Sequence, residues 1–443
     1  MTECNSRTID FTRVGGRRVV ADFNGGRLTT DAGVLLLREV DRQIGLIDAV
    51  NDCLPDPRDP RYIIHDQREM IAQRVFSIAL GYEDLNDQQT LRDDPALQIA
   101  AGKRAEPDDP LASPPTLCRL ENRVNRQALV KMSALFVEQF LASYTSAPDE
   151  IVLDFDATDD PIHGQQEERF FQGYYRHYCF LPLYVFCGGH LLCALLRPSD
   201  IDGAKHSRAV TKLLVDRIRQ EWPDVRIVIR GDSGFCRWRL MRWCEKHDVG
   251  YIFGIGRNPV LERRVTPLME QAEAAFAKTG EKQRLFDETD YAAGTWHRSR
   301  RVIMKAERLE AGPNRRFVVS NLEGDPQFLY DDIYTQRGDM ENRIKEQQLM
   351  LFADRTSCHD FDANQFRLLL SSFAYVLLHQ FRTVHLADTE LATAQVNTIR
   401  LTLLKIAARV IVSARRVVLH LSSSYPHQRV FHVVTNTLIP APG

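Results

Sequence analysis

The sequence lacks the cysteine pattern of a disulfide framework or of a structural zinc site. It holds nine cysteines among 443 residues, an odd number, and no two of them form a Cys-x-x-Cys pair. Both kinds of site need paired or regularly spaced cysteines. We therefore expect reduced thiols and a cytoplasmic protein.

Nucleotide-binding and serine-hydrolase motifs are also missing. No Gly-x-Gly-x-x-Gly or Walker loop follows a predicted strand, and no Gly-x-Ser-x-Gly motif occurs. These absences disfavour NAD-dependent enzymes, P-loop ATPases and serine hydrolases.

A signal peptide and a membrane span are not expected either. Residues 1–14 have no apolar core of the kind that a signal peptide needs. Residues 179–196 form a run of 18 uncharged residues, which is close to a spanning length. Pro182 and a Gly-Gly pair interrupt this run, so we predict a buried β-hairpin in its place.

An excess of charge of one sign is absent from the whole chain but not from its C-terminal part. Lysine and arginine total 57 and aspartate and glutamate total 59, which gives a formal net charge of −2. No acidic residue follows Glu390, whereas six basic residues do: Arg400, Lys405, Arg409, Arg415, Arg416 and Arg429. We expect a helix with Lys405, Arg409 and Arg416 on one stripe, which either contacts phosphates or is a solvated face.

The chain has 44% hydrophobic and 26% charged residues, which is typical of a globular enzyme. Helical periodicity dominates the first 145 residues, and strand-like patterns begin at Glu150. The predicted organisation is a helical N-terminal domain at 1–145, a catalytic core at 146–257 and 331–385, a β-rich insertion at 258–330 and a basic C-terminal segment at 386–443.

The core pattern predicts an α/β domain with a mixed sheet and flanking helices. Strands are expected at 151–157, 225–234 and 251–256, besides the hairpin, and helices at 203–222 and 236–247. Three antiparallel strands followed by alternating helices and strands do not form a doubly wound dinucleotide fold.

Carboxylates stand at the ends of two of these strands. Asp156 and Asp232 each end a predicted strand, although either could simply cap a turn or a helix. On a helix predicted from Tyr334 to about Phe352, the residues that share one polar stripe are Tyr334, Arg337, Glu341, Lys345 and Gln348. The neighbouring apolar stripe, which should pack on the sheet, consists of Ile333, Met340, Ile344 and Leu351.

Three carboxylates without a histidine or cysteine cluster favour Mg²⁺ or Mn²⁺ over zinc. Two such ions about 3.5–4 Å apart can activate an attacking oxygen and stabilise a leaving oxygen during phosphodiester displacement. Metal-dependent cleavage of nucleic acid is therefore the leading chemistry.

The same residues resemble the motifs of DDE transposases of bacterial insertion sequences. Asp156-Ala157-Thr158 is similar to the first aspartate motif, Gly231-Asp232-Ser233 to the second, and Tyr334-x-x-Arg337-x-x-x-Glu341 to the Tyr-Arg-Glu-Lys element of the last catalytic helix. Residues 27–41, 81–95 and 115–123 resemble N-terminal stretches of the insertion-sequence thirteen-eighty group. The sequence departs from the pattern at Gln348, where the family has lysine, and Lys345 lies one turn earlier on the same stripe.

The resemblance implies an RNase H-like core in which Asp156, Asp232 and Glu341 are catalytic and hold two Mg²⁺ ions, for which Mn²⁺ can substitute. It also implies an N-terminal domain that binds DNA or dimerises. The residues expected to contact DNA are Tyr334, Arg337, Lys345, Trp296, Arg298, Arg300 and Arg301. Trp296 either stacks on an unpaired base or packs inside its hairpin.

The implied partners are double-stranded DNA, as terminal inverted repeats and as target, and a second copy of the chain in a synaptic homodimer. A nucleoid-associated bacterial protein without membrane contact is expected. Three functions stay open: a transposase that cuts and joins, a metal nuclease that cuts without joining, and a catalytically inactive DNA-binding relative. The three carboxylates favour the two enzymes, and Gln348 keeps the third function open.

Overall fold

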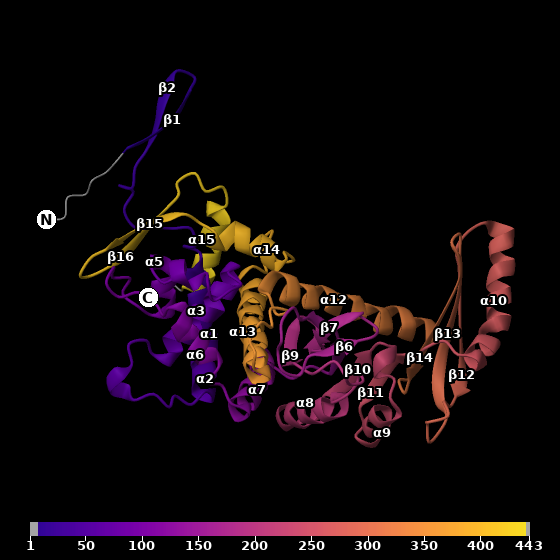
Figure 1. Cartoon of the computed structure of the whole chain (residues 1–443). Coiled ribbons are helices and arrows are strands. Elements are labelled where there is room, and N and C mark those ends of the chain that lie inside the picture. The colour runs from indigo at the N-terminus through magenta and orange to yellow at the C-terminus, as the bar shows by residue number, and fades with distance from the viewer. Residues whose placement is uncertain (1–7, 440–443) are drawn as a thin grey trace. The chain divides into compact units, whose positions relative to one another are not determined.

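The computed structural model describes residues 8–439 and divides the chain into two compact units (Figure 1). Unit 1 runs through Val124 and includes residues 350–352 and the chain from Phe373 onward. Unit 2 holds Asn125–Leu349 and Ala353–Ser372. This division differs from the predicted boundary at residue 145, because helix α7 (Arg126–Ala142) packs onto the core of unit 2.

Unit 2 is built on an eight-stranded sheet with the order β12-β13-β14-β11-β10-β4-β8-β9. The strands are β4 (Glu150–Ala157), β8 (Leu183–Cys187), β9 (His190–Leu195), β10 (Arg226–Gly231), β11 (Gly250–Gly254), β12 (Gln283–Tyr291), β13 (Arg300–Leu309) and β14 (Gly312–Ser320). Strands β4, β8 and β9 are antiparallel, and β10 and β11 continue the sheet in parallel with β4. The predicted α/β fold with an RNase H-like mixed sheet is confirmed, as is the hairpin at the Gly-Gly pair.

The β-rich insertion extends the core sheet. Strand β14 pairs antiparallel with β11, and β13 and β12 follow it outward. The long helix α10 (Pro259–Thr279) packs against β12 and β13 (Figure 1). A small separate sheet of β5 (Asp160–Pro161), β6 (Phe170–Gln172) and β7 (His177–Phe180) lies within the same unit.

Alternation along the strands gives the large sheet two different faces. On β4, Leu153 and Phe155 enter one core, while Asp154 and Asp156 point to the opposite face, as the two-residue period of a strand requires. The first face is covered by α7, α8 (Ser207–Glu221), α9 (Trp238–Lys246) and α10.

The helical segment that carries the polar stripe packs against the second face. It consists of α11 (Pro326–Phe328), the π-helix η3 (Leu329–Tyr334), the 3₁₀ turn η4 (Thr335–Arg337), α12 (Gly338–Lys345) and the π-helix η5 (Glu346–Met350). Leu329 and Tyr330 pack against Ile252 of β11 and Val318 of β14. The predicted helix is thus present but starts earlier and contains π and 3₁₀ turns; Met340, Ile344 and Leu351 are buried, as expected.

Unit 1 joins both ends of the described chain. Its N-terminal helices are α1 (Val34–Ile44), α2 (Leu46–Cys53), η1 (Pro60–Tyr62), α3 (Gln67–Leu80), α4 (Gln88–Leu91), α5 (Pro95–Ala101) and α6 (Pro114–Glu121). Later elements are α13 (Phe361–Gln380), which begins in unit 2, η6 (Phe381–His385), α14 (Val396–Ile399), η7 (Arg400–Leu404) and α15 (Gln428–Leu438). At Gly33 an added Cβ would lie 1.9 Å from the Leu403 carbonyl oxygen, so only glycine allows this close approach of the two ends.

The helix expected around Lys405, Arg409 and Arg416 is wrong. Strand β15 (Ala408–Val412) pairs with β16 (Val417–Leu421) and with β3 (Leu28–Thr29). Residues of β15 alternate between buried and exposed, so a strand buries Ala408 and Val410 together, which a helix would not. Lys405 is held by Asp31 at 2.6 Å and therefore does not belong to an open basic stripe.

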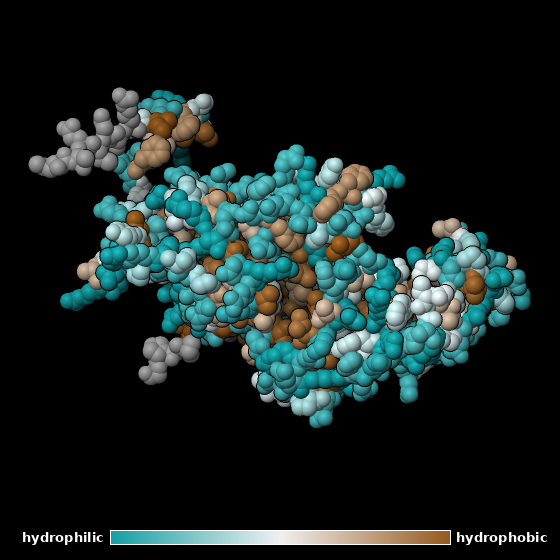
Figure 2. Space-filling view, turned by 60° about the horizontal axis from the view of Figure 1, so that its bottom comes forward, coloured by the Kyte–Doolittle hydropathy of each residue, from teal (hydrophilic) through white to brown (hydrophobic). Residues whose placement is uncertain are grey.

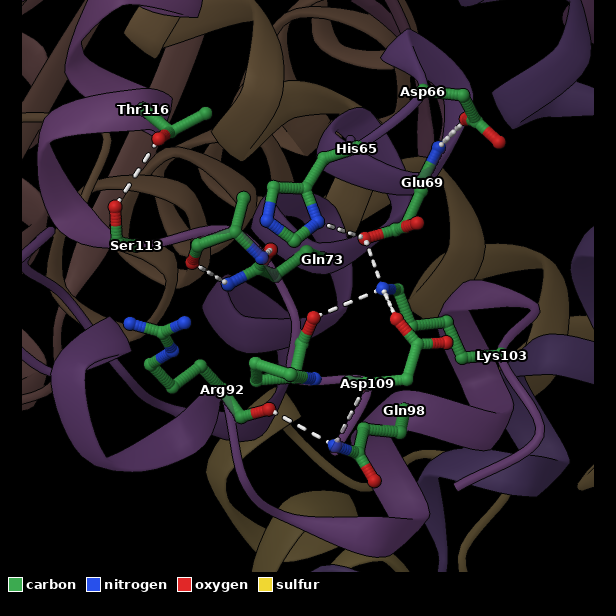
Figure 3. Close-up of polar contacts among 12 residues, drawn as sticks. His65, Asp66, Glu69, Gln73, Arg92, Gln98, Lys103, Asp109, Ser113 and Thr116 are labelled. Atoms are coloured by element: carbon green, nitrogen blue, oxygen red, sulfur yellow. Dashed lines mark hydrogen bonds and ion pairs between the residues drawn. The ribbon is translucent and has the colours of Figure 1, made fainter. Parts of the chain in front are cut away.

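A polar network fixes the acidic, proline-rich connector at 106–115 in unit 1 (Figure 3). Lys103 Nζ lies 2.5 Å from Asp109 and 3.5 Å from Glu69 on α3. Gln98 donates to the Asp109 carbonyl oxygen at 3.4 Å.

No helix among the described residues is both long and apolar enough to cross a membrane.

Candidate active site

The register of two parallel strands brings the predicted aspartates together. In the pairing of β4 with β10, Asp154 lies beside Arg230 and Phe155 beside Gly231. Asp156 follows Phe155 on β4, and Asp232 directly follows the last residue of β10, so both carboxylates lie where the parallel pairing ends. Neighbouring strands are about 4.8 Å apart. This edge is where open α/β sheets usually hold their ligands.

Local hydrogen bonds orient both carboxylates. Asp232 Oδ1 accepts from the Gly234 amide at 2.8 Å and caps the 3₁₀ turn η2 (Ser233–Phe235). Asp156 Oδ1 accepts from the Ala157 amide at 3.0 Å. The capping role considered for Asp232 is therefore real, and it coexists with the position at the sheet edge.

Arg337 links the sheet to the third carboxylate. Its guanidinium Nη2 lies 3.9 Å from Asp156 Oδ1 and 4.0 Å from Glu341 Oε1. Glu341 stands one turn further along the same helical segment, and its side chain is 54% exposed. The helix thus faces the two aspartates, with one arginine between the carboxylates.

Burial and like charge act on Asp156. Burial is the largest cause that raises the pKa of Asp156, to about 6; Arg337 opposes the rise, whereas Asp232 and Glu341 add to it. A half-buried carboxylate with two acidic neighbours is a group that gains from a bound cation. The donor set, oxygen atoms only, suits Mg²⁺ or Mn²⁺.

The three carboxylates are not drawn into one tight cluster. Among the described residues, the group whose ligand atoms all lie within 4.8 Å of one another is Glu167, His359 and Asp360, and all three are exposed. Asp156, Asp232 and Glu341 do not meet that spacing.

Tyr334 packs against the strand next to Asp232. A Cβ added to Gly254 would lie 2.6 Å from Tyr334 Oη and 3.0 Å from the Ser233 amide nitrogen. Burial raises the pKa of Tyr334, and Arg337 lowers it through its charge and a hydrogen bond. Tyr334 therefore holds Arg337 and the helix against β11, besides any contact with DNA.

A buried ion pair under the helix was missed from the sequence. Arg230 donates to both carboxylate oxygens of Asp154, at 2.5 and 2.7 Å, and also to the Ile333 carbonyl oxygen. Both side chains are less than a tenth exposed. Burial raises the pKa of Asp154, and the guanidinium opposes that rise. The pair ties the sheet to the helix four residues before Arg337.

Gln348 is turned toward the protein. Its side-chain amide donates to Asp160 Oδ1 at 2.8 Å and to the Asp159 carbonyl oxygen at 3.1 Å. Asp160 is fully buried, which raises its pKa well above the usual value. Position 348 thus anchors the helix to the segment after β4, whereas Lys345 is exposed.

The basic cluster of the insertion is mostly engaged within the protein. Arg300, which was expected to contact DNA, is 4% exposed and donates to Glu245 at 2.7 Å. Trp296 packs against the core, edge-on to Tyr291, with the Arg300 guanidinium 5.3 Å from its ring centre. The packed alternative holds for this tryptophan.

Two arginines of that cluster remain near the surface. Arg301 pairs with Glu288 and also donates to backbone oxygens of Leu322 and Gly324. Arg298 is 55% exposed and lies 3.0 Å from Glu245. Of the three arginines in the cluster, Arg298 has the most exposed side chain.

One comparison with known proteins identifies a family for this chain. The family model described as "Transposase DDE domain group 1" matches residues 11–442. No curated protein matches the sequence. Among solved structures, the chain is similar to the "piggyBac transposase synaptic complex with hairpin DNA", with a TM-score of 0.44 and 11% identity, over 85% of this chain and 80% of that one.

Proposed function

The chain belongs to the family of DDE-domain transposases, and from this premise we propose that it cuts DNA at the ends of a mobile element and joins the freed 3′ ends to target DNA. The observation that carries the proposal is the position of Asp156 and Asp232, each directly after the paired residues Phe155 and Gly231, together with the contacts of Arg337 to Asp156 and Glu341. We further propose an insertion sequence of the Tyr-Arg-Glu-Lys type.

Asp156, Asp232 and Glu341 would hold two Mg²⁺ or Mn²⁺ ions, which supply Lewis-acid chemistry at an attacking and a leaving oxygen when bound. Asp156 and Asp232 are positioned by the register of the neighbouring strands and by hydrogen bonds that they accept from the backbone amides of Ala157 and Gly234. Glu341 would close over them by rotation of its exposed side chain.

Arg337 would orient the phosphate beside the cleaved bond. A planar guanidinium suits two phosphate oxygens at once, and Arg337 already lies between two of the carboxylates. Tyr334 supports it, and the exposed Lys345 and Arg298 would contact DNA further away. The second subunit of a homodimer would hold the other end of the element, because both ends must be cut together.

The test is a reaction on DNA that carries the inverted repeats flanking the coding region, with Mg²⁺ or Mn²⁺. We expect nicked ends and joined products. Asp156→Asn, Asp232→Asn and Glu341→Gln should each abolish both products. Asp339→Asn, which changes an exposed acid on the same helix, is the matched control and should keep both.

Other outcomes separate the remaining functions. Cleavage without joining would support a metal nuclease, and binding without cleavage would support an inactive relative. If the three carboxylate variants still cut, the assignment of the site is wrong.

A further inference from the structure

The hairpin of β1 (Ile9–Val14) and β2 (Arg17–Ala21) has no role in the site described above. Its strands pair only with each other among the described strands. Every strand residue is exposed except Val19, which is half-buried. An isolated two-stranded hairpin is marginally stable in water, so this one is expected to gain order from a partner.

The tip of the hairpin is strongly basic. Between Phe11 and Ala21 there are three arginines and no acidic residue: Arg13, Arg17 and Arg18. Gly15 and Gly16 make the turn with φ of +54° and +81°, and no atom lies within 4 Å of a Cβ added to either. The tip is therefore narrow and open on all sides.

Two of the three tip arginines are available to a partner. Arg18 is engaged by Asp10 at 2.7 and 2.8 Å. Arg13 and Arg17 are exposed, and neither makes a hydrogen bond or an ion pair within the described chain.

One face of the hairpin is apolar. Ile9 pairs with Ala21 and Phe11 with Val19, so these four side chains lie on the same face. Phe11 is 57% exposed and Ile9 is 42% exposed. Figure 2 shows hydrophobic side chains on the surface of the projecting hairpin.

We propose that this hairpin is an arm that binds double-stranded DNA, with Arg13 and Arg17 on phosphates and the ribbon in a groove. The inference rests on the proposed function. The major groove of B-DNA admits a two-stranded β-ribbon, and apolar side chains can contact thymine methyl groups there. A second copy of the chain would meet the apolar face but would leave the unpaired arginines at the tip unexplained, so their charge favours DNA.

The experiment compares the full-length wild type with Arg13→Ala/Arg17→Ala on duplex DNA from the element's ends. Binding is followed by fluorescence anisotropy between 50 and 200 mM salt. Loss of two phosphate contacts lowers the slope of log affinity against log salt by about 1.8. Over this fourfold increase in salt, the affinity of the wild type for DNA should therefore decrease about 12-fold more than the affinity of the variant.

A matched control removes the same charge elsewhere in unit 1. Arg42→Ala/Arg61→Ala changes two exposed arginines that already pair with Glu39 and Asp59. This control should keep the wild-type slope. A thermal melt of each variant checks folding, which should be unchanged because the hairpin lies outside the buried core.

Phe11→Ser separates the two kinds of partner. Weaker DNA binding with an unchanged oligomeric state supports the arm. If Phe11→Ser instead breaks a dimer, and both double variants bind DNA like the wild type, the hairpin is a subunit contact and the proposal is overturned. If the wild type neither binds nor cuts DNA from the element's ends, the proposed function is refuted. If the wild type cuts this DNA and Arg13→Ala/Arg17→Ala binds and cuts it equally well, only the role of the hairpin is refuted.

Discussion

Removal of the Arg230 guanidinium tests how the catalytic helix is held. In Arg230→Met the Asp154 carboxylate, which is 3% exposed, loses both of its charged hydrogen bonds. Breaking a buried ion pair from one side costs about 3–5 kcal/mol. The Ile333 carbonyl oxygen also loses a donor, which adds about 1 kcal/mol.

The assay is differential scanning calorimetry of the full chain. For a unit of this size, 1 kcal/mol corresponds to about 2–4 °C in melting temperature. Unit 2 of Arg230→Met should therefore melt roughly 8–24 °C below the wild type. The control is Arg217→Met, whose guanidinium pairs with Glu138 near the surface at 2.6 Å. Its cost should be about 0–1 kcal/mol.

A double variant separates stability from positioning. In Asp154→Leu/Arg230→Met no charge is left buried, and such replacements are often neutral or stabilising. We expect its melting temperature to recover while cleavage stays low, because the tie to Ile333 is still missing. If Arg230→Met melted no lower than Arg217→Met, the reasoning about this pair would be refuted.

Three further predictions concern the surroundings of the site. The pKa of Asp156 in the folded protein, about 6, lies above the value of 3.8 for the free group, so ionisation of Asp156 makes the stability of the fold decrease as pH rises from about 4 to 6. Asp156→Asn should remove this decrease. Thermal melts over that pH range without divalent cations measure it. Gln348→Ala should lower the unfolding free energy by about 1–3 kcal/mol in urea titrations, because buried Asp160 loses its hydrogen bond, and Gln348→Lys should recover much of it through an ion pair. Gly254→Ala should cost about 1–3 kcal/mol through the clash with Tyr334, and adding Tyr334→Phe should restore part of it; equal melting temperatures of Gly254→Ala and the wild type would contradict the close approach.

The sequence was sufficient for the mixed sheet of unit 2 and for the order of its core strands and helices along the chain, because long apolar alternations and intervening amphipathic helices leave few arrangements. It also led to Asp156 and Asp232, since polar residues directly after buried strands must gather at one edge of a parallel pair. The Asp154–Arg230 pair was missed because it depends on the register of β4 against β10, which neither strand shows alone.

Two other features depend on tertiary packing. Strand β15 was expected as a helix, because its short apolar run fits both periods and only pairing with β16 and β3 decides between them. Arg300 was expected to contact DNA as part of a basic cluster, and its burial depends on Glu245 from a distant helix. A local sequence pattern does not show which residues far along the chain will pair with a strand or with a charged side chain.

The charges of the site link metal binding to DNA binding. Asp156, Asp232 and Glu341 together carry −3 when ionised, and Arg337 leaves −2, which repels a phosphate. Two divalent ions, as proposed, would change this sum to +2 and attract it. Because such coupling is reciprocal, Mg²⁺ should strengthen the binding of end DNA, and end DNA should strengthen the binding of Mg²⁺ by the same factor. A triple variant, Asp156→Asn/Asp232→Asn/Glu341→Gln, carries no carboxylate at these positions and should bind DNA equally well with and without Mg²⁺. If the DNA affinity of the wild type were the same with and without Mg²⁺, the metal and the phosphate would not bind together at these residues.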